Sequence, residues 1–263
     1  MRGIISGCGS STERLSGFVD YFLQPGMKSL PSFLQDTKHT LQVIESINDQ
    51  IESGQFSLKD VNLVSLGIIS MYSNMSDELG MSACKEYLDS RNFTENCDEI
   101  NIASKKISEA LQLCIQNNFF QFNDRMFKIK GGVGTGIKLA PPYACIGMGK
   151  YEKSVFESQN CLVNLILIWK RFIDDIFMLF KGSISQCEAL VNWLNSLMHS
   201  LMQGVINFTF EFSKERINFL DIEILKEDGK FKTQLFVKPT NLQLFLAVIL
   251  NHPMHCKEGI IYG

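Results

Sequence analysis

The chain has 263 residues, of which 45% are hydrophobic and 20% charged, and its formal net charge is −3. This is an ordinary globular composition, and the length is sufficient for a substantial core in one or two domains. The sequence has no run of about 18 or more apolar residues, and its first seven residues lack the apolar core of a signal peptide. We therefore expect no membrane association and an intracellular protein.

Hydrophobic periodicity predicts both helices and antiparallel strands. In chain order, the predicted elements are a strand over 61–72, a helix from 76, a helix around 107–115, a helix over 143–156, strands over 165–169 and 176–180, a helix over 190–201, and strands over 206–212, 217–225 and 231–237. Ser76 is a suitable N-cap, Pro141 and Pro142 suit a first helical turn, and Asp228-Gly229 is a strong hairpin turn. Because the strands and helices do not alternate strictly, the pattern indicates an α+β fold with helices on one face of an antiparallel sheet.

The eight cysteines are scattered, and none forms a CxxC pair. This argues against a zinc ribbon or a disulfide scaffold and indicates reduced, mostly buried thiols. His252, His255 and Cys256 form one compact group of potential ligands. Because no fourth ligand lies nearby in the sequence, we interpret this group as structural rather than metal-binding.

Charge is distributed unevenly along the chain. Residues 125–171 carry eight Lys or Arg against two acidic residues, whereas residues 76–101 carry seven acidic residues against two basic ones. A basic segment of this kind can present one cationic face to a phosphate backbone, although such clustering is also common on other protein surfaces.

Two adjacent carboxylates, Asp174 and Asp175, lie between the strand-like runs 165–169 and 176–180. We therefore predict that they occupy the tip of a tight hairpin. Asp is a common turn residue, so a purely structural role is one interpretation. The other is a metal site, because polymerases present metal-binding carboxylates at such a tip.

The glycine-rich run Gly131–Pro142 does not fit a phosphate-binding P-loop. Ile137 occupies the position where such a loop needs Lys, no Ser or Thr follows Lys138, and the glycine spacing is not GxGxxG. The run can still let a backbone approach a ligand closely, with Lys138 near enough to meet a phosphate.

Seven sequence motifs along the chain together resemble the reverse transcriptase of Penelope-like retroelements. In order, they are the N-terminal segment 2–10, Ile69-Ser70-Met71-Tyr72-Ser73-Asn74, the segment 117–123, the glycine run ending at 144, Trp169-Lys170-Arg171-Phe172-Ile173-Asp174-Asp175, Ile217-Asn218-Phe219-Leu220-Asp221, and Lys238-Pro239-Thr240 with Asn251-His252-Pro253. The resemblance covers nearly the whole chain. It implies a polymerase palm built on an antiparallel sheet, which extends a DNA primer on an RNA template from dNTPs with two Mg²⁺ ions.

The resemblance also implies roles for individual residues. Asp174 and Asp175 match the catalytic, metal-binding carboxylates of motif C, and Tyr72 matches the motif A aromatic that packs against the nucleotide sugar. By the same resemblance, Gly136 and Lys138 line the nucleotide pocket, and Arg2 contacts the incoming triphosphate. Phe219, Leu220 and Asp221 match the primer grip.

One position departs from the family pattern. Motif A carries its catalytic aspartate five residues before the aromatic, and Gly67 stands there in this chain. Asp60 cannot replace it, because seven strand residues place it roughly 23 Å away and on the opposite strand face. We therefore expect an incomplete metal site and a lost or strongly reduced polymerase activity. The alternative is that Gly67 marks a strand bulge or a close backbone approach.

The resemblance divides the chain into the remainder of the fingers at 1–55, the palm at 56–238 and the start of the thumb at 239–263. Earlier fingers segments, most of the thumb and a downstream endonuclease would be missing, so we expect a fragment of a mobile element, with nuclear location if it is functional. Two other interpretations remain: a non-catalytic module that binds nucleic acid, and an inert remnant. The oligomeric state is not predicted.

Overall fold

The computed structural model describes residues 9–91, 104–122, 125–202 and 206–237. The helices are α1 (Glu13–Lys28), α2 (Thr37–Glu52), α3 (Met71–Asn74), α4 (Asp77–Asp89), α5 (Ser104–Gln116), α6 (Ala140–Phe156) and α7 (Ile184–Met202), with a short 3₁₀ helix, η1 (Cys161–Leu165). The strands are β1 (Asn62–Ile68), β2 (Phe119–Phe122), β3 (Arg125–Lys128), β4 (Ile166–Phe172), β5 (Asp175–Phe180), β6 (Phe208–Ser213), β7 (Arg216–Phe219), β8 (Ile222–Glu227) and β9 (Lys230–Leu235).

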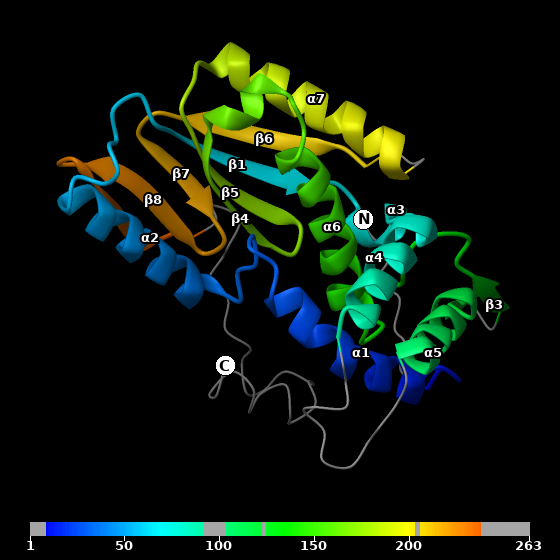
Figure 1. Ribbon diagram of the computed structural model, residues 1–263. Helices are drawn as coiled ribbons and strands as arrows, with labels where there is room; N and C mark the ends of the chain where they lie inside the picture. The colour runs from blue at the N-terminus through cyan, green and yellow to red at the C-terminus, as the bar shows by residue number, and fades with distance from the viewer. Residues whose placement is uncertain (1–8, 92–103, 123–124, 203–205, 238–263) are drawn as a thin grey trace, which may run out of the picture.

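A four-stranded antiparallel sheet with the order β4-β5-β1-β6 forms the centre of the molecule (Figure 1). The strands β7, β8 and β9 form a second antiparallel sheet, and β2 and β3 form a separate hairpin. Because β1 is an inner strand, residues near its end have neighbours on both β5 and β6. This arrangement brings segments that are far apart in sequence together at one edge of the sheet.

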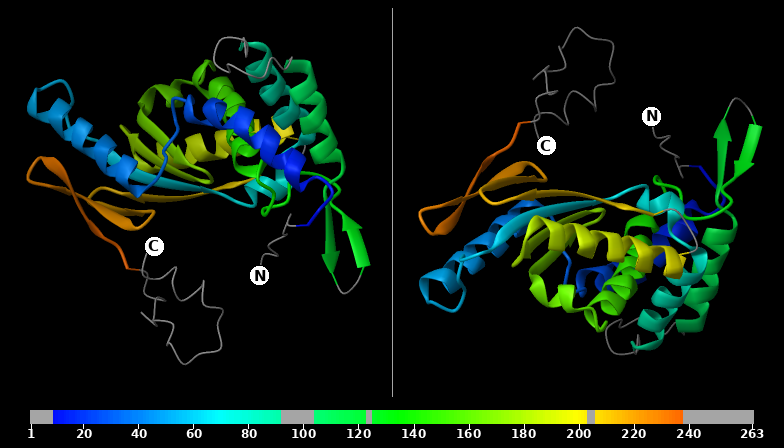
Figure 2. Two further views of the ribbon diagram at one scale, coloured as in Figure 1. Left: turned by 90° about the horizontal axis from the view of Figure 1, so that it is seen from below. Right: turned by 90° about the horizontal axis from the view of Figure 1, so that it is seen from above.

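Both faces of the central sheet are covered. Val64 and Leu66 of β1 belong to the larger hydrophobic cluster, to which α6 and α7 contribute, whereas Leu63 belongs to a second cluster with α2 and the sheet β7-β8-β9. The alternation follows from the period of two in a strand. Figures 1 and 2 show α7 lying along one face of the central sheet and the β7-β8-β9 sheet at one end of the molecule.

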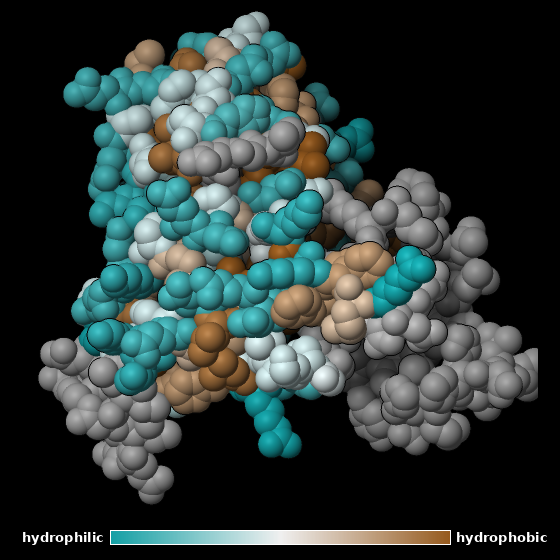
Figure 3. Space-filling model, turned by 90° about the vertical axis from the view of Figure 1, so that its right-hand side faces the viewer, coloured by the Kyte–Doolittle hydropathy of each residue, from teal (hydrophilic) through white to brown (hydrophobic). Residues whose placement is uncertain are grey.

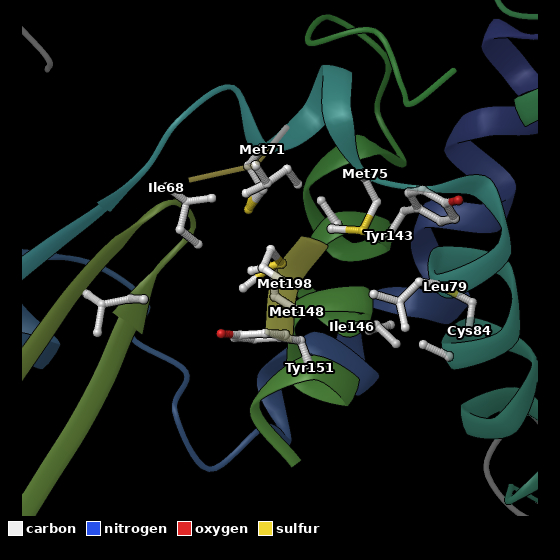
Figure 4. Close-up of a cluster of buried hydrophobic side chains, with 14 of the residues drawn as sticks. Ile68, Met71, Met75, Leu79, Cys84, Tyr143, Ile146, Met148, Tyr151 and Met198 are labelled. Atoms are coloured by element: carbon white, nitrogen blue, oxygen red, sulfur yellow. The ribbon is translucent and has the colours of Figure 1, made fainter. Parts of the chain in front are cut away.

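The larger cluster joins the end of β1 to the helices. Figure 4 shows Ile68 and Met71 directed toward side chains of α6 and α7, including Met148, Tyr151 and Met198. The Tyr151 hydroxyl donates a hydrogen bond of 2.9 Å to the Leu194 carbonyl, so this buried polar atom has a partner. Packing of this kind fixes the end of β1, where the candidate site lies.

Most of the predicted elements are present. The helices predicted from 76, around 107–115, over 143–156 and over 190–201 correspond to α4, α5, α6 and α7, and the Ser76 side chain caps α4 by accepting a 3.0 Å hydrogen bond from the Leu79 N–H. The strands predicted over 165–169, 176–180, 206–212 and 231–237 correspond to β4, β5, β6 and β9. Asp228 and Gly229 both adopt positive φ, as expected for the turn between β8 and β9.

Two predicted strands need correction. The strand predicted over 61–72 ends at Ile68, because Ser70 adopts a φ of 54° and the chain then enters α3. The strand predicted over 217–225 is divided into β7 and β8 by a turn in which Leu220 has a φ of 54°. In addition, α1, α2 and the β2–β3 hairpin have no counterpart among the predicted elements.

The described cysteines are free thiols, of which Cys84, Cys114, Cys145 and Cys187 are buried and Cys161 is exposed. The expectation of mostly buried, reduced thiols is confirmed for this part of the chain. Among the described residues, no helix combines the length and the apolar character that a membrane crossing requires.

Candidate active site

Asp174 and Asp175 lie at the tip of the β4–β5 hairpin, as predicted. Asp174 is in the turn and is half-buried, and Asp175 is the first residue of β5 and is exposed. The preceding residue, Ile173, has a φ of 53°. This conformation is unfavourable for a β-branched residue, so the tip holds a strained backbone of the kind that concentrates at functional sites.

Arg171 fixes this strained tip. Its Nη1 donates a hydrogen bond of 3.0 Å to the carbonyl of Ile173, one residue before Asp174, and its Nη2 donates one of 3.1 Å to the carbonyl of Cys145 in α6. The guanidinium therefore ties the hairpin tip to the helix that follows the glycine run.

The charge of Arg171 is balanced by a buried carboxylate. Glu152 accepts from Arg171 Nε at 2.7 Å, from Trp169 Nε1 at 3.0 Å and from the Ser32 hydroxyl at 2.6 Å. Burial alone lowers the pKa of Arg171, but the nearby charge of Glu152 raises that pKa above its ordinary value. Arg171 was recognised from sequence only as part of a motif, and Glu152 was not singled out. Two features of the sequence could have identified this pair. Arg171 is a charged residue in a largely apolar strand, and Glu152 lies on a helix face that is otherwise apolar.

Gly67 lies beside the two carboxylates. It is the register partner of Asp175, and the N–H of the next residue, Ile68, donates a 2.8 Å hydrogen bond to the Asp174 carbonyl. A Cβ atom added to Gly67 would lie 4.0 Å from Asp175 Oδ1 and 3.0 Å from Thr209 Oγ1 on β6. A side chain at position 67 would therefore point to the Asp175 carboxylate, on the sheet face that Asp175 and Thr209 share.

Asp60 is at the opposite end of β1. Asn62, two residues after Asp60, pairs with Phe180, whereas Gly67 pairs with Asp175. The prediction that Asp60 cannot take the place of the missing acid is therefore confirmed.

The donor set does not fit a two-ion site. Within the described residues, no group of three His, Cys, Asp or Glu side chains is close enough to hold a metal ion. Two adjacent carboxylates are present and a third is absent from the strand that faces them. The facing strand, β1, therefore offers Gly67 rather than a carboxylate opposite Asp175.

Tyr72 lies near the hairpin tip, although it belongs to α3 rather than to a strand. Burial raises the pKa of its phenol, and the charges of Cys145 and Asp174 raise that pKa further. Tyr72 follows four residues after Ile68, whose N–H bonds to the Asp174 carbonyl, so the predicted aromatic comes soon after the strand end that adjoins the predicted acid.

The glycine run packs against Tyr72. The Val133 N–H donates to the Tyr72 carbonyl at 2.9 Å, and Gly132 has a φ of 71°. A Cβ atom on Gly132 would come within 2.4 Å of the Tyr72 carbonyl oxygen, so the close approach requires glycine. Further along, Gly136 and Lys138 are exposed.

The predicted primer-grip residues occupy the turn between β7 and β8. The Phe219 ring is buried and lies 5.7 Å from the ring of Phe177, two residues after Asp175 on β5. Leu220 and Asp221 form the turn itself. The turn therefore lies over the sheet face that carries Asp175 and Gly67.

Several predicted positions lie outside the described residues. These are Arg2, the thumb segment 239–263 and the group His252, His255 and Cys256. The roles and the domain boundaries assigned to them remain predictions.

Comparisons with known proteins identify the fold. No protein-family model and no curated protein sequence matches the chain. Among solved structures, the chain is similar to apo telomerase from Candida tropicalis truncated from its C-terminal domain, with a TM-score of 0.65 and 14% identity over 83% of this chain and 45% of that one. It is also similar to Candida albicans telomerase in complex with the TWJ fragment of telomeric RNA, with a TM-score of 0.61 and 14% identity over 87% of this chain and 39% of that one.

A viral polymerase is a further structural neighbour. The RNA-dependent RNA polymerase of BmCPV at the elongation state has a TM-score of 0.53 and 15% identity over 86% of this chain and 20% of that one. The chain thus spans less than half of each of these proteins. At such low identity the similarity shows the fold alone, which is an α+β polymerase fold like those of telomerase, a reverse transcriptase, and of viral RNA-dependent RNA polymerases.

Proposed function

We propose that this chain is the palm of a reverse-transcriptase-type polymerase related to those of Penelope-like elements, and that its catalytic site is impaired. Its partners are an RNA template, a DNA primer and dNTPs. The polymerase fold and the order of the sequence motifs support this proposal, and the telomerase neighbours solved with an RNA fragment are consistent with a nucleic-acid partner. A retroelement polymerase of this kind acts inside the cell and reaches the nucleus.

The proposed roles follow the arrangement around the hairpin tip. Asp174 and Asp175 are the acidic pair. Tyr72, which follows the end of β1 that bonds to the Asp174 carbonyl, packs against the nucleotide sugar. Lys138 and Gly136 line the nucleotide pocket, and Arg2 meets the triphosphate. The turn formed by residues 219–221 holds the primer end.

One observation carries the proposal of impairment: Gly67 pairs with Asp175 on the adjacent strand, where a side chain would point to the Asp175 carboxylate. Two divalent ions about 4 Å apart repel each other by on the order of 15 to 20 kcal/mol at an effective dielectric constant near 20. Carboxylates must offset this repulsion. With Gly67 in place of an acid, a ligand expected to bridge both ions is absent.

Restoring the acid tests the proposal. We expect the Gly67→Asp variant of the full chain to extend a labelled DNA primer on an RNA template with Mg²⁺ about a hundredfold or more faster than the parent protein, which is the usual effect of one electrostatic group in an active site. Gly67→Asn is the matched control, because it adds the same volume without the charge. Gly67→Asp combined with Asp174→Asn should again be inactive.

The neighbouring threonine determines how the new side chain fits. The Thr209 hydroxyl must move by a few tenths of an ångström to admit a Cβ atom at position 67. Gly67→Asp is therefore also prepared with Thr209→Ala, which removes this contact. Equal extension by the Asp and Asn variants in both backgrounds, or robust extension by the parent, contradicts the proposal.

A second candidate function is non-catalytic binding of nucleic acid. The exposed cations Arg125, Lys128 and Lys130 favour it over an inert remnant. A phosphate-binding surface gives an affinity that falls steeply with salt concentration. A signal that is undetectable or independent of salt in a filter-binding titration leaves only the inert remnant.

A further inference from the structure

The β2–β3 hairpin projects away from the body of the protein, as both views of Figure 2 show. Every residue of β3 is exposed, including Met126 at 66% and Phe127 at 40%, and Phe119 of β2 is 39% exposed. Figure 3 shows the side of the molecule on which the hairpin lies, where hydrophobic side chains lie between hydrophilic ones. An isolated two-stranded hairpin is marginally stable, and the exposed aromatic rings on this one are accessible to a binding partner.

Each face of this hairpin combines an aromatic ring with a cation. Phe120 and Phe127 are register partners, and their rings stack with centroids 5.4 Å apart. Since side chains alternate between faces, Arg125 shares the face of Phe127. On the other face, Lys128 Nζ lies 5.9 Å from the centroid of the Phe119 ring.

Three cations of the basic segment 125–171 lie on this hairpin or directly after it. Further along the segment, Arg171 pairs with Glu152, Lys150 with Glu86 and Lys153 with Glu157. Arg125, Lys128 and Lys130 form no ion pair with any described residue, and all three are exposed. Of the five cations of the segment that pair with no described acid, three therefore lie beside the aromatic rings, and the other two are Lys138 and Lys170.

The base of the hairpin adjoins the glycine run. The Ile129 N–H donates to the Asn118 carbonyl at 2.9 Å, and four residues later Val133 contacts Tyr72. The side chain of Asn118 is buried, has no hydrogen-bond partner in the described structure, and has its Oδ1 3.3 Å from the Cβ position of Gly134. An unpaired buried amide is uncommon in folded proteins. The hairpin is therefore joined directly to the glycine run that contacts Tyr72 of the proposed active site.

We propose that the β2–β3 hairpin is a binding surface for single-stranded nucleic acid. The exposed rings stack on bases, and Arg125, Lys128 and Lys130 contact phosphates. Basic residues interleaved with aromatic rings are the combination used by proteins that bind single strands without sequence preference. A protein partner would meet the same rings but would need acidic residues opposite the three cations. This inference rests on the proposed function, because the single-stranded nucleic acid bound by the hairpin would be one that the proposed polymerase holds.

The test is a fluorescence-anisotropy titration of the full chain with a labelled single-stranded oligouridylate at several salt concentrations. We expect the Arg125→Gln/Lys128→Gln variant to reduce the slope of log affinity against log salt by about 1.4, because each phosphate contact on a single strand contributes about 0.7. Phe127→Leu should weaken binding about fivefold, the lower end of the contribution of one stacked base, and Phe127→Tyr should bind like the parent.

Matched controls remove the same groups elsewhere. Lys181→Gln/Lys214→Gln removes two exposed cations outside the hairpin, and Phe156→Leu removes a ring that is 47% exposed. Both should bind like the parent.

Four results overturn the inference, the first three of which concern binding. They are an equal loss of slope in both charge variants, unchanged affinity of Phe127→Leu, and an absence of binding by the parent at low salt. A change in the sedimentation of Phe127→Leu without a change in binding would assign the hairpin to protein contacts and would overturn it too. Because this titration needs no catalysis, its outcome is separate from that of primer extension by Gly67→Asp.

Discussion

At the scale of single residues, the side chain at position 67 sets how much negative charge faces the hairpin tip. A glycine there leaves the backbone pairing of β1 and β5 intact, because Ile68 still bonds to the Asp174 carbonyl. The strand geometry is thus compatible with an acid, and Thr209 is the neighbour that must adjust. The hydrogen bond from Arg171 to the carbonyl of the strained Ile173 fixes the backbone of the hairpin tip, and the side chain of residue 67 takes no part in it.

The buried thiols give a prediction about pH at this scale. Burial raises the pKa of Cys114 and of Cys187 from the ordinary value of 9.0 to about 11. Between these values the unfolded chain releases protons that the folded chain retains, so the free energy of unfolding falls as the pH rises from about 9 to about 11. Urea unfolding of the parent at about pH 8 and about pH 10 measures this fall. It should be smaller in the variant Cys114→Ala/Cys187→Ala.

Thiol reactivity provides the check. At about pH 8 iodoacetamide should modify the exposed Cys161 much faster than the buried Cys114 and Cys187. Equal rates in the folded protein would show that the two thiols are not buried as described.

At the scale of elements, the ion pair of Arg171 and Glu152 joins β4 to α6. Arg171→Met leaves the Glu152 carboxylate buried without its charge partner, and we expect a loss of about 3–5 kcal/mol in the free energy of unfolding. Arg171→Met/Glu152→Leu should lose less than the sum of the two single variants, because neither charge is then left unpaired. Urea unfolding of the four proteins of this cycle gives the coupling energy.

The exposed pair Lys106–Glu109 on α5 is the control for this prediction. Its side chains are 71% and 48% exposed, so Glu109→Gln should cost less than about 1 kcal/mol. Additive effects at Arg171 and Glu152 would contradict the role assigned to the buried pair.

Elements with a clear period or cap could be predicted from the sequence, and those held by distant contacts could not. Pro25 and Gly26 interrupt the helical signal of α1, yet the helix persists because Phe22 and Leu23 are buried. A Cβ atom on Gly26 would lie 2.7 Å from the Tyr87 ring on α4, so glycine at this position lets α1 pack closely against α4. The sequence alone does not reveal this contact. The hairpin of β2 and β3 was missed because its strands have four residues each.

At the scale of the whole molecule, the order of the motifs predicted a polymerase palm, and the structural neighbours confirm the polymerase fold. The hairpin tip and the position of Gly67 beside it could also be predicted, because strand spacing and motif order fix them. Thr209, Glu152 and Ser32 reach the same region from other parts of the chain. Only the fold brings such residues together, so no local pattern marks them.

Binding of Mn²⁺, a spectroscopic substitute for Mg²⁺, tests most directly whether the metal site is incomplete at Gly67. In a titration followed by electron paramagnetic resonance, we predict that the parent has no tight site and that Gly67→Asp gains one. Gly67→Asp should bind Mn²⁺ at least about tenfold more tightly than the parent, equivalent to about 1.4 kcal/mol. This gain in affinity should be lost when Asp174→Asn is added. Gly67→Asn should behave as the parent does. A parent protein that already binds Mn²⁺ as tightly as Gly67→Asp, through Asp174, would contradict the account.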